Sequence, residues 1–228
     1  MKVPEVEGDM MKKRILSGLS IIFICLFIYS SLANARDIEP IKLLPPELKV
    51  GKLLMQALKD RESRRDFSPE EIPLQTLSNL LWAANGINRP AIQHKTAPSA
   101  MNMQEIDIYV ARKDGLYLFD AENNTLEPIL MKNIMAVTGK QAFVEDAPIN
   151  LIFVADFSKM SRLSGAEKDF YAAIDTGYIS QNVYLFCASG NLATVARGWI
   201  DKPALAKAMN LRPDQKVILA QTVGYPKK

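Results

Sequence analysis

The segment from Lys168 to Ser189 is the feature of the sequence that most constrains the fold. Hydrophobic residues fall on almost every side of the helix it would form, and Gly190 with Asn191 ends the pattern. A helix that is apolar nearly all round is expected to be buried. Residues 149–155 form a nearly continuous apolar run, which is typical of a strand covered on both faces. The core is therefore predicted to contain this helix and this strand.

Shorter elements are predicted from periodicity and from Gly and Pro punctuation. Apolar spacing favours helices over residues 48–59, 74–84 and 203–209, and Ser68-Pro69-Glu70-Glu71 is predicted to start a further helical turn. Alternation predicts a hairpin of strands 106–111 and 115–119, and strands over 192–200 and 216–224. Residues 85–95 are interpreted as a loop and 120–130 as turn-rich, with a short helical turn at 140–144.

The bulk composition excludes several function classes. With 48% hydrophobic and 23% charged residues, the 228-residue chain is globular rather than disordered. A net charge of +3 gives no basic face of the kind that binds nucleic acid. The single histidine, His94, has no metal-binding or triad motif around it, so no metal site is predicted. Two cysteines make no disulfide framework.

The N-terminal residues 1–35 have the order of a secretory signal peptide. Met11-Lys12-Lys13-Arg14 is basic, residues 15–32 carry no charge, and Ala33-Asn34-Ala35 is a cleavage-type pattern. We therefore expect export to the periplasm or the extracellular space, with Met11 as a better start than Met1. The apolar run is also long enough for an uncleaved membrane anchor. No other segment is predicted to contact a membrane.

Residues 36–46 follow as an extended, proline-containing lead-in, and residues 47–228 as one domain. Near the start of this domain, Arg61, Ser63 and Arg65 alternate, so an extended backbone would project all three from one face. Two guanidiniums and a hydroxyl on one face suit a phosphate. The alternative is a solvated charged turn, which is the commoner fate of such a run.

Four patterns, taken together and in order, resemble the FMN-dependent nitroreductase family across residues 47–228. They are Arg61-x-Ser63-x-Arg65-x-Phe67, Pro98-Ser99-Ala100-x-Asn102-x-Gln104, Asp175-x-Gly177-x-x-x-Gln181-Asn182-x-x-Leu185 and Val223-Gly224-Tyr225-Pro226. Residues 81–86 and 115–117 further resemble the branch of azoline (thiazole/oxazole peptide) dehydrogenases.

The resemblance implies an α+β fold with a central mixed β-sheet flanked by helices. It also implies an intertwined homodimer with FMN at each of two interface sites and the long helix in the dimer core. In such enzymes a hydride enters flavin N5 and leaves to an acceptor, so the cofactor carries the chemistry. No catalytic side chain is therefore expected, which fits the absence of an acid–base pair in the sequence.

The resemblance also assigns cofactor-binding positions. Arg61 and Arg65 would hold the FMN phosphate, and Ser63 would lie near the ring edge or ribityl chain. Glu62 occupies a position that is often basic or polar in the family, which departs from the pattern. The residues expected to line the isoalloxazine from the other subunit are Pro98, Ser99, Ala100 and Asn102.

Further contacts are implied toward the C-terminus. Gln141 would supply an amide to the ring, and a loop of Val195, Ala196, Arg197 and Gly198 would pass its N5 side. An Arg197 guanidinium near N1/O2 or N5 would stabilise reduced, anionic flavin. Lys227 would reach the phosphate, with a solvated tail as the alternative.

Three functions are carried forward from these patterns. The first is an FMN oxidoreductase that passes a hydride to a small acceptor of the nitroaromatic or quinone class, with NAD(P)H as a possible donor. An exported enzyme would meet little NAD(P)H, so the donor could differ. The second is a flavin dehydrogenase that oxidises a substrate such as a peptide azoline. The third is a flavin-binding protein without turnover.

Overall fold

The computed structural model describes residues 38–228, so the predicted signal segment lies outside the described residues. Residues 39–228 form one compact unit. Its strands are β1 (Ile41–Lys42), β2 (Ile87–Arg89), β3 (His94–Lys95), β4 (Ile106–Ala111), β5 (Leu116–Asp120), β6 (Thr125–Leu130), β7 (Ile149–Asp156), β8 (Ala193–Arg197) and β9 (Gln215–Gly224). Its α-helices are α2 (Leu54–Asp60), α3 (Leu74–Asn85), α4 (Gly165–Ser189) and α5 (Lys202–Ala208). Its short 3₁₀ turns are η1 (Pro90–Ile92), η2 (Ala100–Asn102), η3 (Met135–Thr138), η4 (Ala142–Val144) and η5 (Phe157–Met160).

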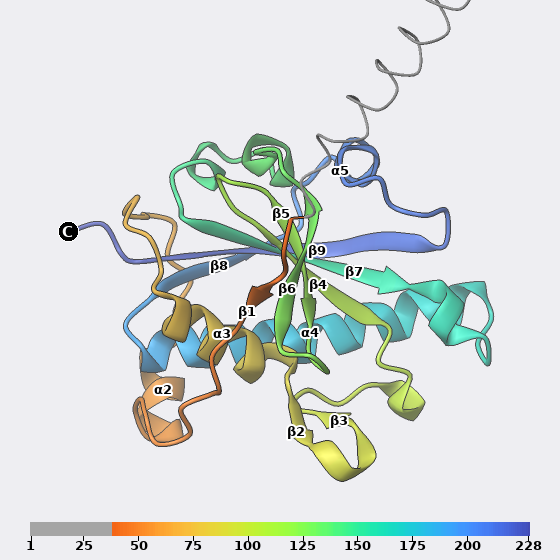
Figure 1. The fold of residues 1–228 in the computed structure, drawn as a ribbon, viewed down its shortest axis with the longest axis horizontal. Coiled ribbons are helices and arrows are strands. Elements are labelled where there is room, and N and C mark those ends of the chain that lie inside the picture. Colours follow the sequence, from red (N-terminus) through yellow and green to blue (C-terminus); the bar gives the residue numbers. More distant parts are fainter. Residues whose placement is uncertain (1–37) are drawn as a thin grey trace, which may run out of the picture. The chain divides into compact units, whose positions relative to one another are not determined.

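A seven-stranded sheet in the order β1-β6-β5-β4-β7-β9-β8 forms the centre of the domain (Figure 1). The predicted hairpin of β4 and β5 is confirmed, with Tyr109 opposite Leu118. We expected a mixed sheet, but each strand pairing in the described residues is antiparallel. Hairpin turns join β4 to β5 and β5 to β6, and such turns reverse the chain direction, which gives antiparallel neighbours.

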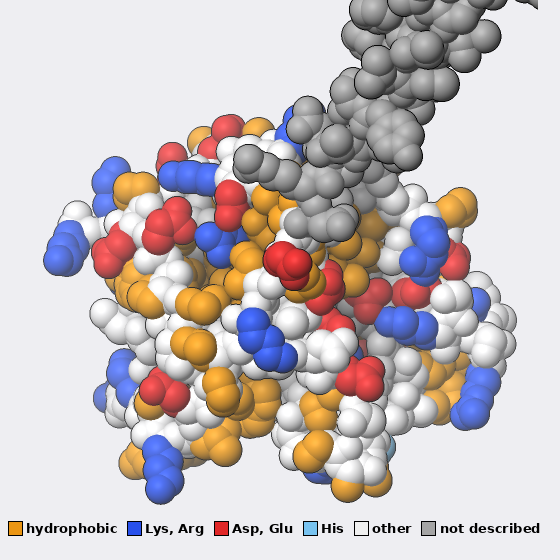
Figure 2. Space-filling model, in the orientation of Figure 1, with side chains coloured by type: hydrophobic (Ala, Val, Ile, Leu, Met, Phe, Trp, Pro, Cys, Tyr) orange, Lys and Arg blue, Asp and Glu red, His pale blue; other side chains and the backbone are white. Residues whose placement is uncertain are grey.

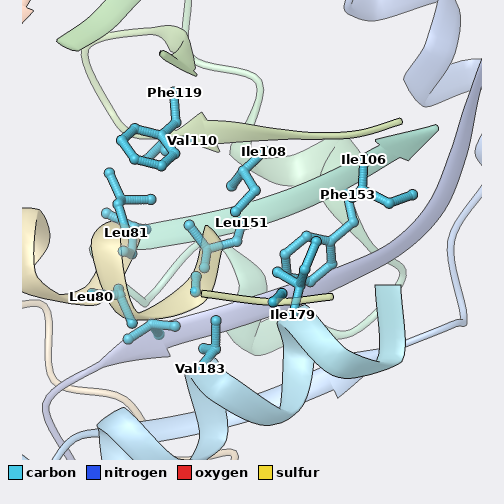
Figure 3. Close-up of a cluster of buried hydrophobic side chains, with 14 of the residues drawn as sticks. Leu80, Leu81, Ile106, Ile108, Val110, Phe119, Leu151, Phe153, Ile179 and Val183 are labelled. Atoms are coloured by element: carbon cyan, nitrogen blue, oxygen red, sulfur yellow. The ribbon is translucent and has the colours of Figure 1, made fainter. Parts of the chain in front are cut away.

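Helices cover one face of the sheet and η3 and α5 cover the other. Alternate residues of β4 and β7 point to opposite sides because the side-chain period of a strand is two. Ile108 and Phe153 pack with Leu80 of α3 and Ile179 of α4 in the larger core cluster (Figure 3). Tyr109, Ile152 and Val154 pack on the other side with residues of η3 and α5, including Met135 and Leu205. The expected doubly covered strand at 149–155 is confirmed, since every residue of β7 is buried.

Helix α4 runs along the helical face of the sheet beside α3 (Figure 1). Its first turn is closed by a capping box between Ser164 and Glu167. We expected burial on all sides, but only one face is buried in the single chain. Phe170 is 61% exposed and Tyr178 is 48% exposed, whereas Ile179 is buried. The apolar pattern of α4 therefore exceeds what its own chain can cover.

Two predicted helices differ in the structure. The helix expected over 48–59 begins only at Leu54, because Gly51 adopts a left-handed φ of 91° that interrupts helical geometry. The helical turn expected at Ser68 does not form. Instead Ser68 N–H donates to the Tyr225 carbonyl, and Phe67 forms a β-bridge with Pro226. Backbone pairing with the C-terminal residues therefore forms in place of the predicted helical turn.

The stretch from 120 to 130 was interpreted as turn-rich, yet Thr125–Leu130 is strand β6, paired with both β5 and β1. The turn at Asp120 is evident from the sequence, and the Asp120 carboxylate accepts hydrogen bonds from the backbone N–H groups of Glu122 and Asn123. The strand is not evident, because Pro128 lies within it and proline is uncommon in strands. Residues 85–95 contain the short β2–β3 pair rather than a plain loop.

Within residues 38–228, helices long and apolar enough to cross a bilayer are absent. In the same part of the chain, no cluster of three or more His, Cys, Asp or Glu side chains could hold a metal ion.

Candidate functional site

The charged segment that follows α2 is fixed between β8 and the C-terminal residues (Figure 1). Arg64 N–H donates to the Thr194 carbonyl at 3.0 Å, which fixes the segment to β8. Lys227 N–H donates to the Asp66 carbonyl at 3.2 Å, next to the Phe67–Pro226 bridge. The tertiary pairing therefore places Lys227 beside the Arg61–Arg65 stretch, although about 160 residues separate them in the sequence.

Tyr184 of α4 lies at the centre of this region. Its phenol oxygen accepts a hydrogen bond from the Ala196 N–H at 2.9 Å and lies 2.9 Å from the Ser63 hydroxyl. The Arg61 guanidinium carbon lies 5.4 Å from the centroid of its ring, within cation–π range. Tyr184 was missed by the sequence reasoning. The available signal was its place beside Asn182 and Leu185 in the third motif.

A cleft of about 420 Å³ opens beside this segment. Four cationic side chains and two carboxylates line it, together with parts of the end of α4 and the start of β8. The cations are Lys52, Lys59, Arg61 and Arg64, and the carboxylates are Asp60 and Glu62. The excess of positive charge suits an anionic group.

The three alternating side chains of the predicted clamp do not behave alike. Arg61 and Ser63 both point to Tyr184, whereas Arg65 is exposed and takes part in none of the ion pairs of the described chain. Arg64 lies 3.0 Å from the Asp66 carboxylate and 3.8 Å from that of Glu62. Hydrogen bonding between Arg64 and Asp66 raises the pKa of the arginine and lowers that of the carboxyl. Glu62 therefore lies within ion-pair distance of a neighbouring arginine.

Arg197 is buried on the other side of β8, in the strand rather than in the expected loop. Its Nε donates to Thr222 Oγ1 at 2.8 Å, Nη1 to the Thr138 carbonyl at 2.9 Å and Nη2 to Asn150 Oδ1 at 2.8 Å. All of these acceptors are uncharged, and burial lowers the pKa of Arg197 to about 10. The guanidinium thus attaches η3 to the sheet.

Gln141 lies three residues after Thr138, whose carbonyl accepts a hydrogen bond from Arg197. Lys140 N–H donates to the Trp199 carbonyl at 3.2 Å, so this segment lies along the end of β8 near Gly198. The Gln141 Oε1 atom is buried without a hydrogen-bond partner in the described chain. A buried carbonyl oxygen without a donor is costly, and a bound ligand is one way to satisfy it.

Val195 packs on this side with Phe67 and Phe143, whose rings lie 5.5 Å apart. The structure therefore gathers the predicted residues of the charged segment, of residues 139–143, of β8 and of the C-terminus. These are Arg61, Glu62, Ser63, Arg65, Gln141, Val195, Ala196, Arg197, Gly198 and Lys227.

The remaining predicted residues, Pro98, Ser99, Ala100 and Asn102, lie elsewhere in the same chain. The Ala100 N–H donates to Asp175 Oδ2 at 2.8 Å. Asp175 and Tyr184 are nine positions apart on α4, which corresponds to about 13 Å along the axis and roughly opposite faces. The two groups of residues therefore lie at separate places on the single chain.

The fold is an α+β domain with a cation-lined cleft beside Tyr184. The comparisons assign this domain: the chain belongs to the nitroreductase family. The model of that family, the "Nitroreductase family", matches residues 58–225. The protein is accordingly an oxidoreductase.

Individual relatives agree with this assignment. A Methanocaldococcus jannaschii protein described as a candidate nitroreductase is 32% identical over 172 residues, which are 71% of this chain and 81% of that protein. The crystal structure of a candidate nitroreductase from Ralstonia eutropha has a TM-score of 0.81 at 38% identity, over 85% of this chain and 92% of that one. A candidate nitroreductase from Desulfovibrio desulfuricans, solved with FMN, shares the fold with a TM-score of 0.56 at 21% identity, over 78% and 88% of the chains.

Proposed function

We propose that this protein is a homodimeric FMN oxidoreductase that passes a hydride through flavin N5 to a small acceptor of the nitroaromatic or quinone class. The observation that carries the proposal is the meeting of Arg61, Ser63 and Ala196 at Tyr184, beside a cleft with an excess of cations. FMN is the cofactor in the Desulfovibrio desulfuricans relative.

The residues present fit this cofactor. The terminal phosphate of FMN is a dianion, and the region around Arg61 offers guanidinium, ammonium and hydroxyl donors. The unpartnered Oε1 of Gln141 is an acceptor that a ring N–H could satisfy. No part of this fit requires a metal or a nucleophile.

When bound, FMN supplies the hydride acceptor and donor, so the side chains have positioning roles. We assign phosphate binding to Arg61, Arg65 and Lys227. Tyr184 orients the Ala196 segment through its 2.9 Å bond and holds Ser63. Gln141 orients the ring, and Arg197 fixes the backbone on which Gln141 lies.

Surfaces that one chain leaves exposed support the proposed dimer. Phe170 and Tyr178 of α4 are largely exposed, and so are Leu53 (84%) and Met55 (76%) around α2. Figure 2 shows hydrophobic side chains gathered over the region of α2 and α3. A second copy is the proposed occupant, because it would also bring its Pro98–Asn102 segment to the flavin that one chain alone leaves incomplete.

The hydride donor and the substrate of the reaction are proposed separately. NAD(P)H is the proposed donor for a small acceptor. The branch resemblance of residues 81–86 and 115–117 keeps a peptide azoline dehydrogenase as the alternative. A flavin protein without turnover is disfavoured by the family assignment.

Spectroscopy and turnover test the proposal on the purified full chain. We expect a yellow protein with one FMN per subunit, and oxidation of NADH or NADPH that accelerates with nitrofurazone or menadione. A colourless protein that does not bind added FMN would overturn the proposal. Bound FMN with turnover of a peptide azoline alone would select the alternative.

We also propose that residues 1–35 direct export, with residues 47–228 as the catalytic domain. N-terminal sequencing of the protein from cell fractions tests this. A periplasmic or secreted chain that begins at Arg36 supports it, and a cytoplasmic chain that retains residues 15–32 contradicts it.

A further inference from the structure

Glu105 is a buried carboxyl group that the proposed site does not use. It precedes β4, its exposed fraction is 0%, and neither of its carboxyl oxygens receives a hydrogen bond from an N–H or O–H group of the described chain. Asp175 on α4 is 2% exposed and lines the same small cavity as Gln104 and Ile106, the residues on either side of Glu105. Two buried carboxyl groups therefore lie near each other.

Two neighbouring buried carboxyl groups cannot both be ionised without a large cost, which favours the protonated form of Glu105. Burial, and to a smaller extent the neighbouring charge of Asp175, raises the pKa of Glu105 to about 7. The other charged groups near Glu105 are the cations Lys159 and Lys95. Lys159 lowers the pKa of Glu105 by a smaller amount, and Lys95 of β3 also interacts with the Glu105 carboxyl. The proton therefore leaves near neutral pH.

The carboxylate of Asp175 holds the segment from Pro98 to Gln104. Asp175 Oδ2 accepts the Ala100 N–H at 2.8 Å. Within this segment Met101, Asn102 and Gln104 all have left-handed φ values near 50°. Non-glycine residues in this region are strained by about 1 kcal/mol or more each, so the segment keeps this shape only while it is held.

We propose that Glu105 and Asp175 form a protonation-dependent latch that holds the Pro98–Gln104 segment in the conformation that lines the cofactor of the partner subunit. Glu105 acts through Asp175 and is thus a positioning residue. When Glu105 loses its proton, the negative charges repel, and the segment opens to hydrate them. The assignment of the segment to the flavin rests on the proposed function, whereas the latch itself does not.

Amide hydrogen exchange of residues 98–104 tests the latch in the flavin-free full chain. Exchange is measured at pH 5, 6, 7 and 8 and corrected for the intrinsic chemical rate. If opening exposes and ionises Glu105, protection falls roughly tenfold per pH unit from pH 5 to pH 7 and then levels. Glu105→Gln, which keeps a donor toward Asp175 but cannot ionise, is expected to remove this slope. The control Glu122→Gln changes an exposed glutamate and is expected to retain it.

Protection without a pH slope in the wild-type chain overturns the latch even if no variant can be purified. The second readout is the FMN dissociation constant over the same pH range. It is expected to weaken toward pH 7 in the wild type more than in Glu105→Gln, and this comparison cancels the titration of the FMN phosphate. Equal profiles in the two proteins would overturn the link to the cofactor. A pH slope in exchange with no FMN binding at any pH would support the latch and overturn the proposed function.

Discussion

The phenol oxygen of Tyr184 accepts the backbone N–H of Ala196 at 2.9 Å, and this bond joins the long helix α4 to strand β8. The same oxygen contacts the Ser63 hydroxyl at 2.9 Å. One side chain thus positions two segments of the proposed flavin site that lie far apart in the sequence.

Tyr184→Phe is expected to weaken FMN binding about tenfold and to destabilise the fold by about 1 kcal/mol, because the partly buried Ala196 N–H loses its acceptor. FMN fluorescence titration and urea unfolding measure the two effects. Tyr171→Phe on the same helix is the control, since the Tyr171 hydroxyl makes none of the side-chain hydrogen bonds of the described chain. Equal behaviour of the two variants would contradict the role of Tyr184.

Arg61→Ala is expected to raise the FMN dissociation constant roughly thirtyfold, because a charge-assisted phosphate contact contributes about 2 kcal/mol. Riboflavin, which lacks the phosphate, should bind the variant and the wild type equally. Arg112→Ala is the matched control. Arg112 pairs with Asp114 on the β4–β5 turn and lies over Tyr117, away from the cleft. A similar loss with riboflavin would show that Arg61 does not act on the phosphate.

Gly139→Ala is expected to destabilise the fold by about 1–3 kcal/mol, because its Cβ would lie 1.9 Å from Arg197 Nη1 and force the guanidinium out of its three hydrogen bonds. Chemical unfolding provides the measurement. At Gly165, the first residue of α4, an added Cβ meets nothing within 4 Å, so Gly165→Ala should be neutral or slightly stabilising. A tolerated Gly139→Ala would show that Arg197 can move at low cost.

Stability is expected to fall as the pH rises from about 4.5 to 7. Burial raises the pKa of Glu105 from 4.5 to about 7, so in this window the folded chain binds a proton that the unfolded chain has lost. The full contribution is present below pH 4.5, and about 3 kcal/mol is lost by pH 7. Urea unfolding at several pH values measures the slope, and Glu105→Gln should flatten it. An unchanged slope in that variant would assign it to other groups.

Phe170→Asp is expected to convert the dimer to a monomer and to abolish FMN binding. In one chain the side chain is 61% exposed and the substitution is harmless, but at an interface it buries a charge. Analytical ultracentrifugation reports the mass. Met131→Asp places the same charge at another exposed apolar position and should remain dimeric. A wild-type chain that sediments as a monomer would refute the proposed dimer directly.

Much of the fold could be predicted from local patterns. The apolar run of β7, the alternation of β4 and the glycine stop after Ser189 each produce a signal within a few residues. Local signals give the wrong element where a segment far away in the sequence offers competing backbone hydrogen bonds. Ser68 has a helix-start sequence but bonds to Tyr225, and β6 forms because β5 and β1 offer backbone partners on both sides of it.

The candidate site divides in the same way. Arg61, Ser63 and Gln141 could be named from their types and order, because the kind of group that a residue can bind depends on its side chain. Their partners could not, since hydrogen bonds and burial depend on which surfaces meet. Hence only the structure shows that the buried Arg197 guanidinium is bonded to Thr138, Asn150 and Thr222.

The sequence alone determined the long helix, the main buried strands, the family and the residue types that can bind a phosphate, because periodicity and ordered motifs are local properties of a chain. Only the tertiary structure decided that Tyr184 joins Ser63 to Ala196 and that Glu105 lies near Asp175. Such contacts arise when segments far apart in the chain pack together, and packing also sets the dielectric surroundings that move a proton.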